Sequence, residues 1–144
     1  MHHYPVTRFN ALFVFVTFLV FVGCSQDYSK ETLQGKWKVA SMEANMPELS
    51  PAIIKSGEEL ALSTTYWFKE DGTSVETSSY YPDGIPGVWR FDADSMTLHI
   101  NSTDEAIPSN AKHKVAFINK REITLTQDYD KLGELSMKLI KVKK

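Results

Sequence analysis

The sequence has little of several features that define large classes of protein. It contains one cysteine, Cys24, so no disulfide bond can form within the chain and stability must come from a hydrophobic core. Its 16 lysines and arginines do not outnumber its 18 acidic residues, so the composition gives no reason to expect nucleic-acid binding. With 42% hydrophobic and 24% charged residues over 144 positions, the chain is typical of one globular domain rather than of a disordered protein.

No hydrophobic run is long enough to span a bilayer comfortably. The longest, residues 11–22, is interrupted by Thr17, whereas a spanning helix needs ~20 apolar residues. The run follows Arg8, which is the only charged side chain before Cys24. A short apolar segment behind a positive charge is typical of a signal peptide, and residues 1–23 are therefore predicted to be one.

The four residues Phe21-Val22-Gly23-Cys24 resemble a bacterial lipobox. The resemblance implies cleavage before Cys24, a diacylglycerol on its thiol and acylation of the new amino group, and two or more acyl chains hold a protein firmly on a membrane. Phe21 stands where leucine is usual, and the alternative is a conventional signal peptide with Cys24 present by chance. Ser25 is not aspartate, which by resemblance to the sorting rule of double-membraned bacteria favours the outer membrane over the inner one.

After the signal peptide, residues 24–32 are predicted to be the lipidated cysteine and a polar tether, and residues 33–144 one domain. In this domain polar and apolar residues mostly alternate, which is the pattern of half-buried strands. Short turns separate the strands; Asp71-Gly72, for example, supplies the positive φ that a tight hairpin requires. The expected strands are residues 36–39, 64–69, 74–77, 87–91, 96–100, 114–118, 123–126 and 135–139.

The segment after the first expected strand has a helical pattern. Ser50-Pro51 fits a helix cap followed by proline in the first turn, and apolar residues then recur on one helical face. Gly57 costs ~1 kcal/mol in a helix interior, and residues 56–59 also fit a second capping box. The segment is therefore either one short helix or two turns with a kink at Gly57.

Strands joined by short turns predict an all-β fold, an antiparallel up-and-down barrel of about eight strands with one short helix after the first strand. Closure of the sheet removes exposed edges. A barrel of this size is just wide enough for side chains or one small ligand. We expect a monomer.

Three motifs carry a resemblance to a known family. Leu-x-Gly-x-Trp stands at residues 33–37, an aromatic strand ending in Asp-Gly at residues 66–72, and Gly-x-Trp at residues 87–89. Over residues 33–142 the chain is similar to the small lipocalin-like lipoproteins of Bacteroidetes-type bacteria. The resemblance implies a lipocalin-like barrel in which Gly35 and Trp37 form the structural signature, and it implies no established ligand.

The sequence departs from that family in one basic residue. Lipocalins usually place an arginine late in the chain, across the tryptophan of the first strand. No arginine follows Arg121 here, so Arg90 or Lys138 is the expected substitute.

Four aromatic residues are the candidate ligand site. Tyr66, Phe68, Trp89 and Phe91 alternate along two predicted strands and would face the barrel interior. The alternative is that they form the core, because large aromatic side chains bury much area in a small domain. Trp67 should face outwards. The loop that holds Tyr80 and Tyr81 is a candidate for the barrel mouth.

Neither a metal site nor an enzyme is indicated. His99 and His113 lie on different predicted strands, without cysteine or carboxylate at ligand spacing. The sequence has no Gly-x-Ser-x-Gly, no phosphate-binding glycine loop and no His-Glu-x-x-His. We therefore expect no metal, no cofactor and no catalytic residues. A cleft with convergent polar groups of perturbed pKa would be needed to support an enzyme.

Two functions are expected at this stage. The first is a cell-envelope lipoprotein, held on the membrane by acyl chains on Cys24, whose barrel binds a small apolar or amphipathic ligand. The second is an envelope interaction protein with a packed barrel and no ligand, which would use Trp67 and the Tyr80-Tyr81 loop as contact surfaces.

Overall fold

Within residues 28–144, eight antiparallel strands close into one up-and-down barrel. The computed structural model describes these residues, and the predicted signal peptide and Cys24 lie outside them. The predicted fold class, an all-β barrel with a short helix after the first strand, is confirmed. In chain order the elements are α1 (Lys30–Leu33), β1 (Gly35–Asn45), α2 (Pro51–Leu62), β2 (Thr65–Phe68), β3 (Thr73–Thr77), β4 (Ile85–Asp92), β5 (Thr97–Ser102), β6 (Asn110–Asn119), β7 (Glu122–Asp128), the 3-10 helix η1 (Asp130–Leu132) and β8 (Glu134–Lys141).

The barrel closes through β1, which pairs with both β2 and β8. Trp37 lies at the closure and is opposite Tyr66 on one side and Lys141 on the other. β1 reaches both partners because it is long and carries a bulge between Val39 and Ser41, and a bulge bends a strand and increases its twist. Its alternating side chains then face the barrel interior along its first half.

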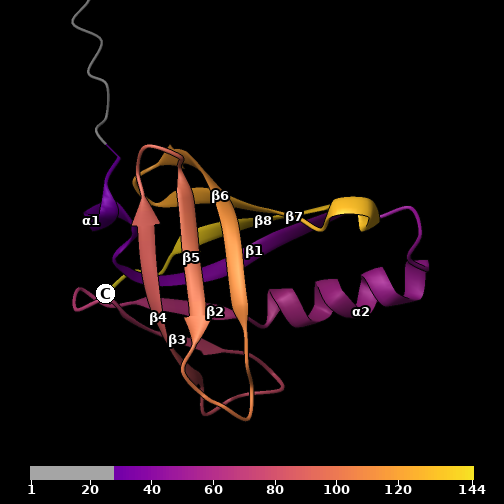
Figure 1. Cartoon of the computed structure of the whole chain (residues 1–144), viewed down its shortest axis with the longest axis horizontal. Coiled ribbons are helices and arrows are strands. Elements are labelled where there is room, and N and C mark those ends of the chain that lie inside the picture. Colours follow the sequence, from indigo (N-terminus) through magenta and orange to yellow (C-terminus); the bar gives the residue numbers. More distant parts are fainter. Residues whose placement is uncertain (1–27) are drawn as a thin grey trace, which may run out of the picture.

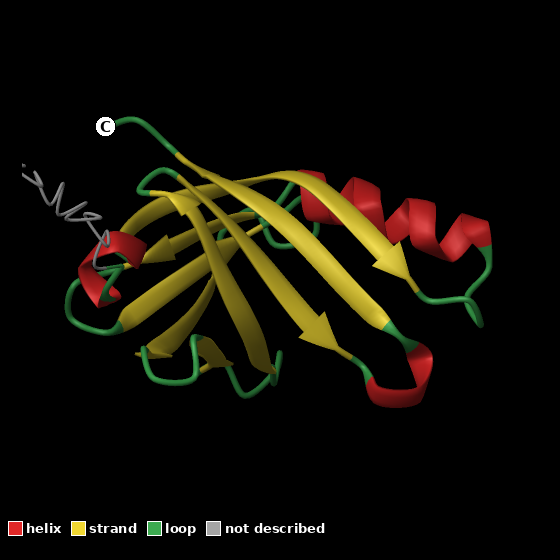
Figure 2. Cartoon of the chain, turned by 90° about the horizontal axis from the view of Figure 1, so that it is seen from above, coloured by secondary structure: helices red, strands yellow, loops and turns green. Residues whose placement is uncertain are grey.

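The barrel has two distinct ends (Figures 1 and 2). In both views α1 and the C-terminus lie at the left, whereas η1 and the far end of α2 lie at the right. The turns at residues 69–72, 93–96 and 120–121 belong to the first end, which we call the α1 end. The longer loops at residues 78–84, 103–109 and 129–133 belong to the opposite end, which we call the mouth.

Helix α2 is continuous. Ser50 caps it by accepting a hydrogen bond from the Ile53 amide, and Pro51 occupies the first turn, as the sequence predicts. The kink considered at Gly57 is absent from α2, because the cap and the packing of α2 on β1 outweigh the ~1 kcal/mol propensity cost of one glycine.

One strand begins later than the alternation predicts. The sequence placed Met96 in the fifth strand, on the same face as Leu98 and Ile100, but β5 begins at Thr97. Met96 has a φ of 51°, a left-handed conformation that closes the turn after β4. The Met96 carbonyl accepts a hydrogen bond from the Val115 amide, which holds this turn against β6.

Helix α1 covers the α1 end of the barrel. The Trp37 indole N–H donates to the Leu33 carbonyl at 2.7 Å, so the buried tryptophan is satisfied by the helix above it. The ammonium of Lys141 lies 5.1 Å from the Trp37 ring and donates to the Thr32 carbonyl at 2.7 Å. Residues 30–32, which the sequence analysis placed in the tether, thus form part of this cover.

Lys141 therefore takes the place expected for the late basic residue. The sequence pointed to Arg90 or Lys138 instead, and Lys138 forms an ion pair with Glu122 on the outer surface. Lys141 was missed because its partner is set by the pairing of β1 with β8, which are the two ends of the domain in sequence.

Candidate functional site

The α1 half of the barrel interior is packed with aromatic side chains. Phe68 has no exposed surface and Trp89 is 4% exposed. The Phe68 ring lies 5.3 Å from that of Trp89 and 5.9 Å from that of Tyr66. The Trp89 indole donates to the Lys69 carbonyl at 2.9 Å, which fixes its orientation. The partly buried Phe91 makes an edge contact with Phe117 at 5.9 Å.

The mouth half of the interior contains a cavity of about 280 Å³, which we call the cup. Of the four predicted ligand residues, Tyr66 lines it. Phe68 and Trp89 are packed further toward the α1 end, within the hydrophobic core. The structure thus brings three of the four together as one aromatic cluster and places Tyr66 in the wall of the cup. Apolar wall residues are Met42, Leu60, Ala61, Ile85, Ala111, Leu135 and Met137.

Polar groups with unusual protonation behaviour face the same cup. Burial, followed by the nearby carboxyl of Glu76, raises the pKa of the Tyr66 hydroxyl well above its usual value. Burial also raises the pKa of the Glu76 carboxyl. Tyr129 donates to the Gln127 side-chain oxygen at 3.0 Å, and burial raises its pKa as well. Each shift favours the neutral form of its own group.

His113 is the one histidine among the described residues that line the cup. Its side chain is 4% exposed, and burial lowers its pKa to about 4. The ring is therefore neutral at pH 7, and its Nδ1 has no hydrogen-bond partner. A buried ring nitrogen without a partner is costly unless something else satisfies it. His113 lines the cup, but among the described residues its Nδ1 has neither a partner nor appreciable accessible surface, so this atom lies within the wall.

A second cavity of about 190 Å³ adjoins the cup. The two share Glu76, Ile85 and Ser109 as wall residues. Asn101 lines the second cavity, and its buried Oδ1 also lacks a hydrogen-bond partner. The two cavities thus lie side by side along these shared residues.

The rim of the cup is aromatic. Tyr80 and Tyr81 lie in the loop between β3 and β4 and line the cup, which agrees with the mouth position predicted for that loop. Tyr80 is 72% exposed, so much of its ring is free at the entrance. Helix α2 contributes Gly57, Leu60 and Ala61 along one side.

Sequence reasoning missed most of the polar wall. His113 was considered only as a metal ligand, and Glu76 was read as part of a strand without a role. Period-two alternation could have placed both inside, since Val115 and Ser74 are buried on the same strands two residues away. No group of three histidine, cysteine, aspartate or glutamate side chains in residues 28–144 is arranged to hold a metal ion.

Comparison with known proteins supports the fold. No family model matches the chain, and no curated protein matches it. Among solved structures it is similar to a DUF4847 family protein from Bacteroides vulgatus, with 16% identity and a TM-score of 0.50 over 77% of this chain and 94% of that one. The class of protein defined here is therefore a closed up-and-down β-barrel, similar to a barrel protein of Bacteroides. No helix of the described residues is both long and apolar enough to cross a membrane.

The burial of His113 makes stability depend on pH. Its pKa is about 4 in the folded protein and ~6.5 in the unfolded chain, so between these values the unfolded state binds a proton that the folded state excludes. The free energy of unfolding should therefore fall as the pH is lowered from 6.5 to 4, by up to ~3 kcal/mol. Urea unfolding of the wild type and of His113→Leu over this range measures the difference.

The matched control is His99→Leu, because His99 lies on the neighbouring strand and is only half-buried, although burial lowers its pKa too. His99→Leu should keep most of the dependence on pH and His113→Leu should lose it. The variants are compared with each other because Glu76 also affects the result. Its raised pKa increases the free energy of unfolding as the pH falls, opposite to His113, over part of the same pH range. Equal pH dependence in the wild type and in His113→Leu would contradict a buried neutral imidazole.

Proposed function

We propose that this protein is a cell-envelope lipoprotein with a lipocalin-like barrel, anchored by acyl chains on Cys24 in the outer membrane, that binds a small amphipathic molecule in the cup. The observation that carries the binding proposal is the cup itself, a cavity at the mouth of the barrel whose largely apolar wall includes the neutral imidazole of His113. The lipobox-like residues 21–24 and the Gly35 and Trp37 signature support the anchor and the family resemblance.

The size and chemistry of the cup favour a particular class of ligand. A volume of about 280 Å³ is at the lower end of small-molecule pockets, which span ~300–1,000 Å³. Burial favours the neutral forms of Tyr66, Glu76 and His113. An uncharged ligand with an apolar body and one or two hydrogen-bonding groups would satisfy these side chains without burying an ion.

Polar groups of perturbed pKa around one cavity are also the feature that an enzyme would need. Histidine and glutamate are common general acids and bases. Binding remains our proposal because each group can contact a ligand in the protonation state that burial favours. Acid–base chemistry near pH 7 would instead require His113 to gain a proton well above its lowered pKa.

The second candidate is an envelope interaction protein. Trp67 is 39% exposed and Tyr81 is partly exposed, so aromatic side chains are present on the outer face and on the rim. Aromatic residues are common in protein interfaces. This function requires no ligand in the cup, and the experiment below separates the two candidates.

The test is native mass spectrometry of the full chain extracted in detergent from the envelope of its own host. We expect a mass increased by acyl chains on Cys24, together with a retained small molecule. Tyr66→Phe should lower ligand occupancy ~2–10-fold, because one hydrogen bond contributes ~0.5–1.5 kcal/mol. Ala111→Phe, which puts a ring into the cup, should remove the ligand.

Tyr28→Phe is the matched control, since it removes a hydroxyl at the α1 end, away from the cup. It should retain the ligand at the wild-type level. A ligand-free wild type would support the interaction-protein function. A ligand retained equally by Ala111→Phe would place binding outside the cup, and a Cys24→Ala variant with unchanged mass increment would disprove acylation at that residue.

A further inference from the structure

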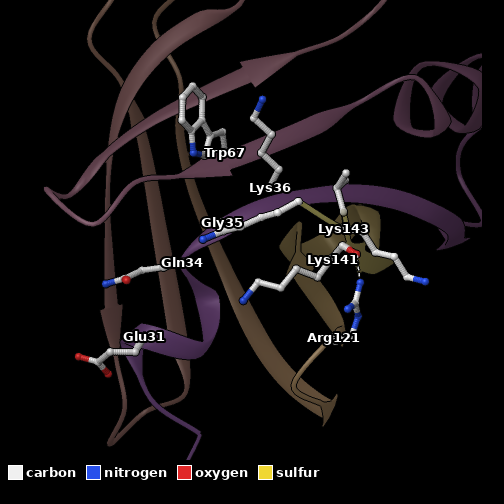
Figure 3. Close-up of a pocket in the computed structure, with 10 residues that line it drawn as sticks. Glu31, Gln34, Gly35, Lys36, Trp67, Arg121, Lys141 and Lys143 are labelled. Carbon is white, nitrogen blue, oxygen red and sulfur yellow. Dashed lines mark hydrogen bonds between the residues drawn. The ribbon is translucent and has the colours of Figure 1, made fainter.

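A groove crosses the outer surface of the α1 end, and cations gather along it. Its volume is about 850 Å³. Figure 3 shows Lys36 and Trp67 on one side of the groove, with Lys141, Lys143 and Arg121 on the other. Lys144 also lines it, and Glu31 is the one carboxylate among the lining side chains of this part of the described chain.

This arrangement separates charge in an otherwise acidic chain. The sequence has a formal net charge of -2, yet five cations and one carboxylate line the groove. Arg121 donates to the Lys141 carbonyl at 3.2 Å, so the end of β8 holds the cations close together. Burial, followed by the proximity of Arg121 and Lys144, lowers the pKa of Lys141, whose ammonium group contacts the Thr32 carbonyl and the Trp37 ring.

An exposed tryptophan lies among the same cations. Trp67 projects outwards from β2 and is 39% exposed. The ammonium groups of Lys36 and Lys69 lie 4.6 and 4.3 Å from its ring centroid. Tryptophan with lysine is the combination that prefers the interface between water and lipid headgroups.

The groove lies close to the point where the described chain begins. The Tyr28 ring stacks on Phe117 of β6 at 4.6 Å. Helix α1 follows at once, and Glu31 of this helix and Gln34 just after it line the groove. Tyr28 is four residues after Cys24, and four fully extended residues span at most ~14 Å. An acylated Cys24 would therefore hold the α1 end within ~14 Å of the bilayer surface.

We propose that the groove and Trp67 form a docking face for an anionic membrane surface. This proposal rests on the anchor proposed above. Each lysine or arginine near an anionic bilayer strengthens binding about fivefold, and a short tether keeps the face close to lipid headgroups. The docked barrel rests on its α1 end, and the mouth, at the opposite ends of the strands, faces away from the membrane and is open to water-borne ligands.

The experiment is lysine-acetylation footprinting of the acylated full chain in vesicles. The vesicles are phosphatidylcholine, or phosphatidylcholine with roughly one-third phosphatidylglycerol. We expect acetylation of Lys36 and Lys143 to fall about fivefold in the anionic vesicles relative to the neutral ones. Lys55 on α2 and Lys131 on η1, both exposed, should react equally in both. Salt of ~1 M, with a Debye length of ~3 Å, should abolish the protection of Lys36 and Lys143.

Charge-reversal variants provide the matched control, with Lys36 as the reporter. Arg121→Glu/Lys143→Glu should lose the protection of Lys36, whereas Lys55→Glu/Lys131→Glu makes the same change in charge elsewhere and should keep it. Equal acetylation of Lys36 in neutral and anionic vesicles would overturn the proposal. Equal protection by inorganic phosphate with neutral vesicles would also overturn it, by showing an anion site rather than a membrane-docking face.

Failure of the anchor would be distinguishable from failure of docking. Flotation with neutral vesicles reports the acyl anchor, because no anionic lipid is present. A protein that does not float with neutral vesicles lacks the anchor. If that protein floats with anionic vesicles and Lys36 is protected, docking is supported without the anchor; if it floats with neither, docking is overturned too.

Discussion

Replacing Phe68 by alanine is expected to lower the free energy of unfolding by ~3–5 kcal/mol, a large part of the ~5–15 kcal/mol available to a domain. The side chain has no exposed surface and contacts the rings of Tyr66 and Trp89. The strands around it are joined in a closed hydrogen-bonded ladder, which limits how far the walls can move into the space that is left. Urea or thermal unfolding measures the loss.

Trp67→Ala is the control, because it removes a larger side chain from the adjacent position. Trp67 faces outwards and contacts the ammonium groups of Lys36 and Lys69. Loss of exposed cation–π contacts costs ~1 kcal/mol. If Phe68→Ala lowered the free energy of unfolding by less than ~1 kcal/mol, the α1 half would not be a packed core. Phe68 would then again be a candidate ligand contact.

Replacing Gly133 by alanine is expected to destabilise the protein by ~2–5 kcal/mol, through strain and overpacking together. Gly133 has a φ of 115°, which side-chain-bearing residues rarely adopt. A Cβ there would overlap the backbone carbonyl oxygen of Asn45 and lie 3.2 Å from the Met46 Cα. The obstacle is backbone rather than a flexible side chain, so the loop before β8 would have to move.

The control for this prediction is the same substitution at Gly57. This glycine lies inside α2, and an added Cβ would meet the Met42 Cε at 3.9 Å, an ordinary contact. Gly57→Ala should therefore stabilise the protein by ~0.5–1 kcal/mol. Chemical denaturation of both variants gives two changes of opposite sign, and similar destabilisation by both would contradict the described position of η1 and Gly133.

Local patterns in the sequence were enough to predict most elements. Alternation in β2 placed Tyr66 and Phe68 inside and Trp67 outside, because successive strand residues point to opposite faces. Ser50 and Pro51 located the start of α2, because helix caps act over a few residues. The strand count and the short turns then indicated the barrel. Met96 shows the limit of such patterns, because its turn conformation is held by Val115 from another hairpin.

The candidate site was less predictable. Aromatic spacing identified one cluster of Tyr66, Phe68 and Trp89, yet spacing does not say how deep each ring lies along the barrel axis. The depth of each ring depends on the stagger of the strands and on α1, which covers the α1 end of the barrel. The polar wall, His113 above all, followed the alternation of its strand but has no motif of its own. The acylation of Cys24 lies outside the described residues and stays a prediction.

The sequence by itself determined the order and type of the eight strands and of α2, because period, capping and turn chemistry are local properties of the chain. It also contains Gly35 and Trp37, which carry the resemblance to lipocalin-like proteins, and the lipobox-like residues 21–24. Tertiary structure decided which basic residue lies across Trp37, since Lys141 comes from the far end of the domain. It likewise decided where the cup lies and which cations form the groove. Barrel closure juxtaposes residues a hundred positions apart, and the register of β1 with β8 sets those contacts.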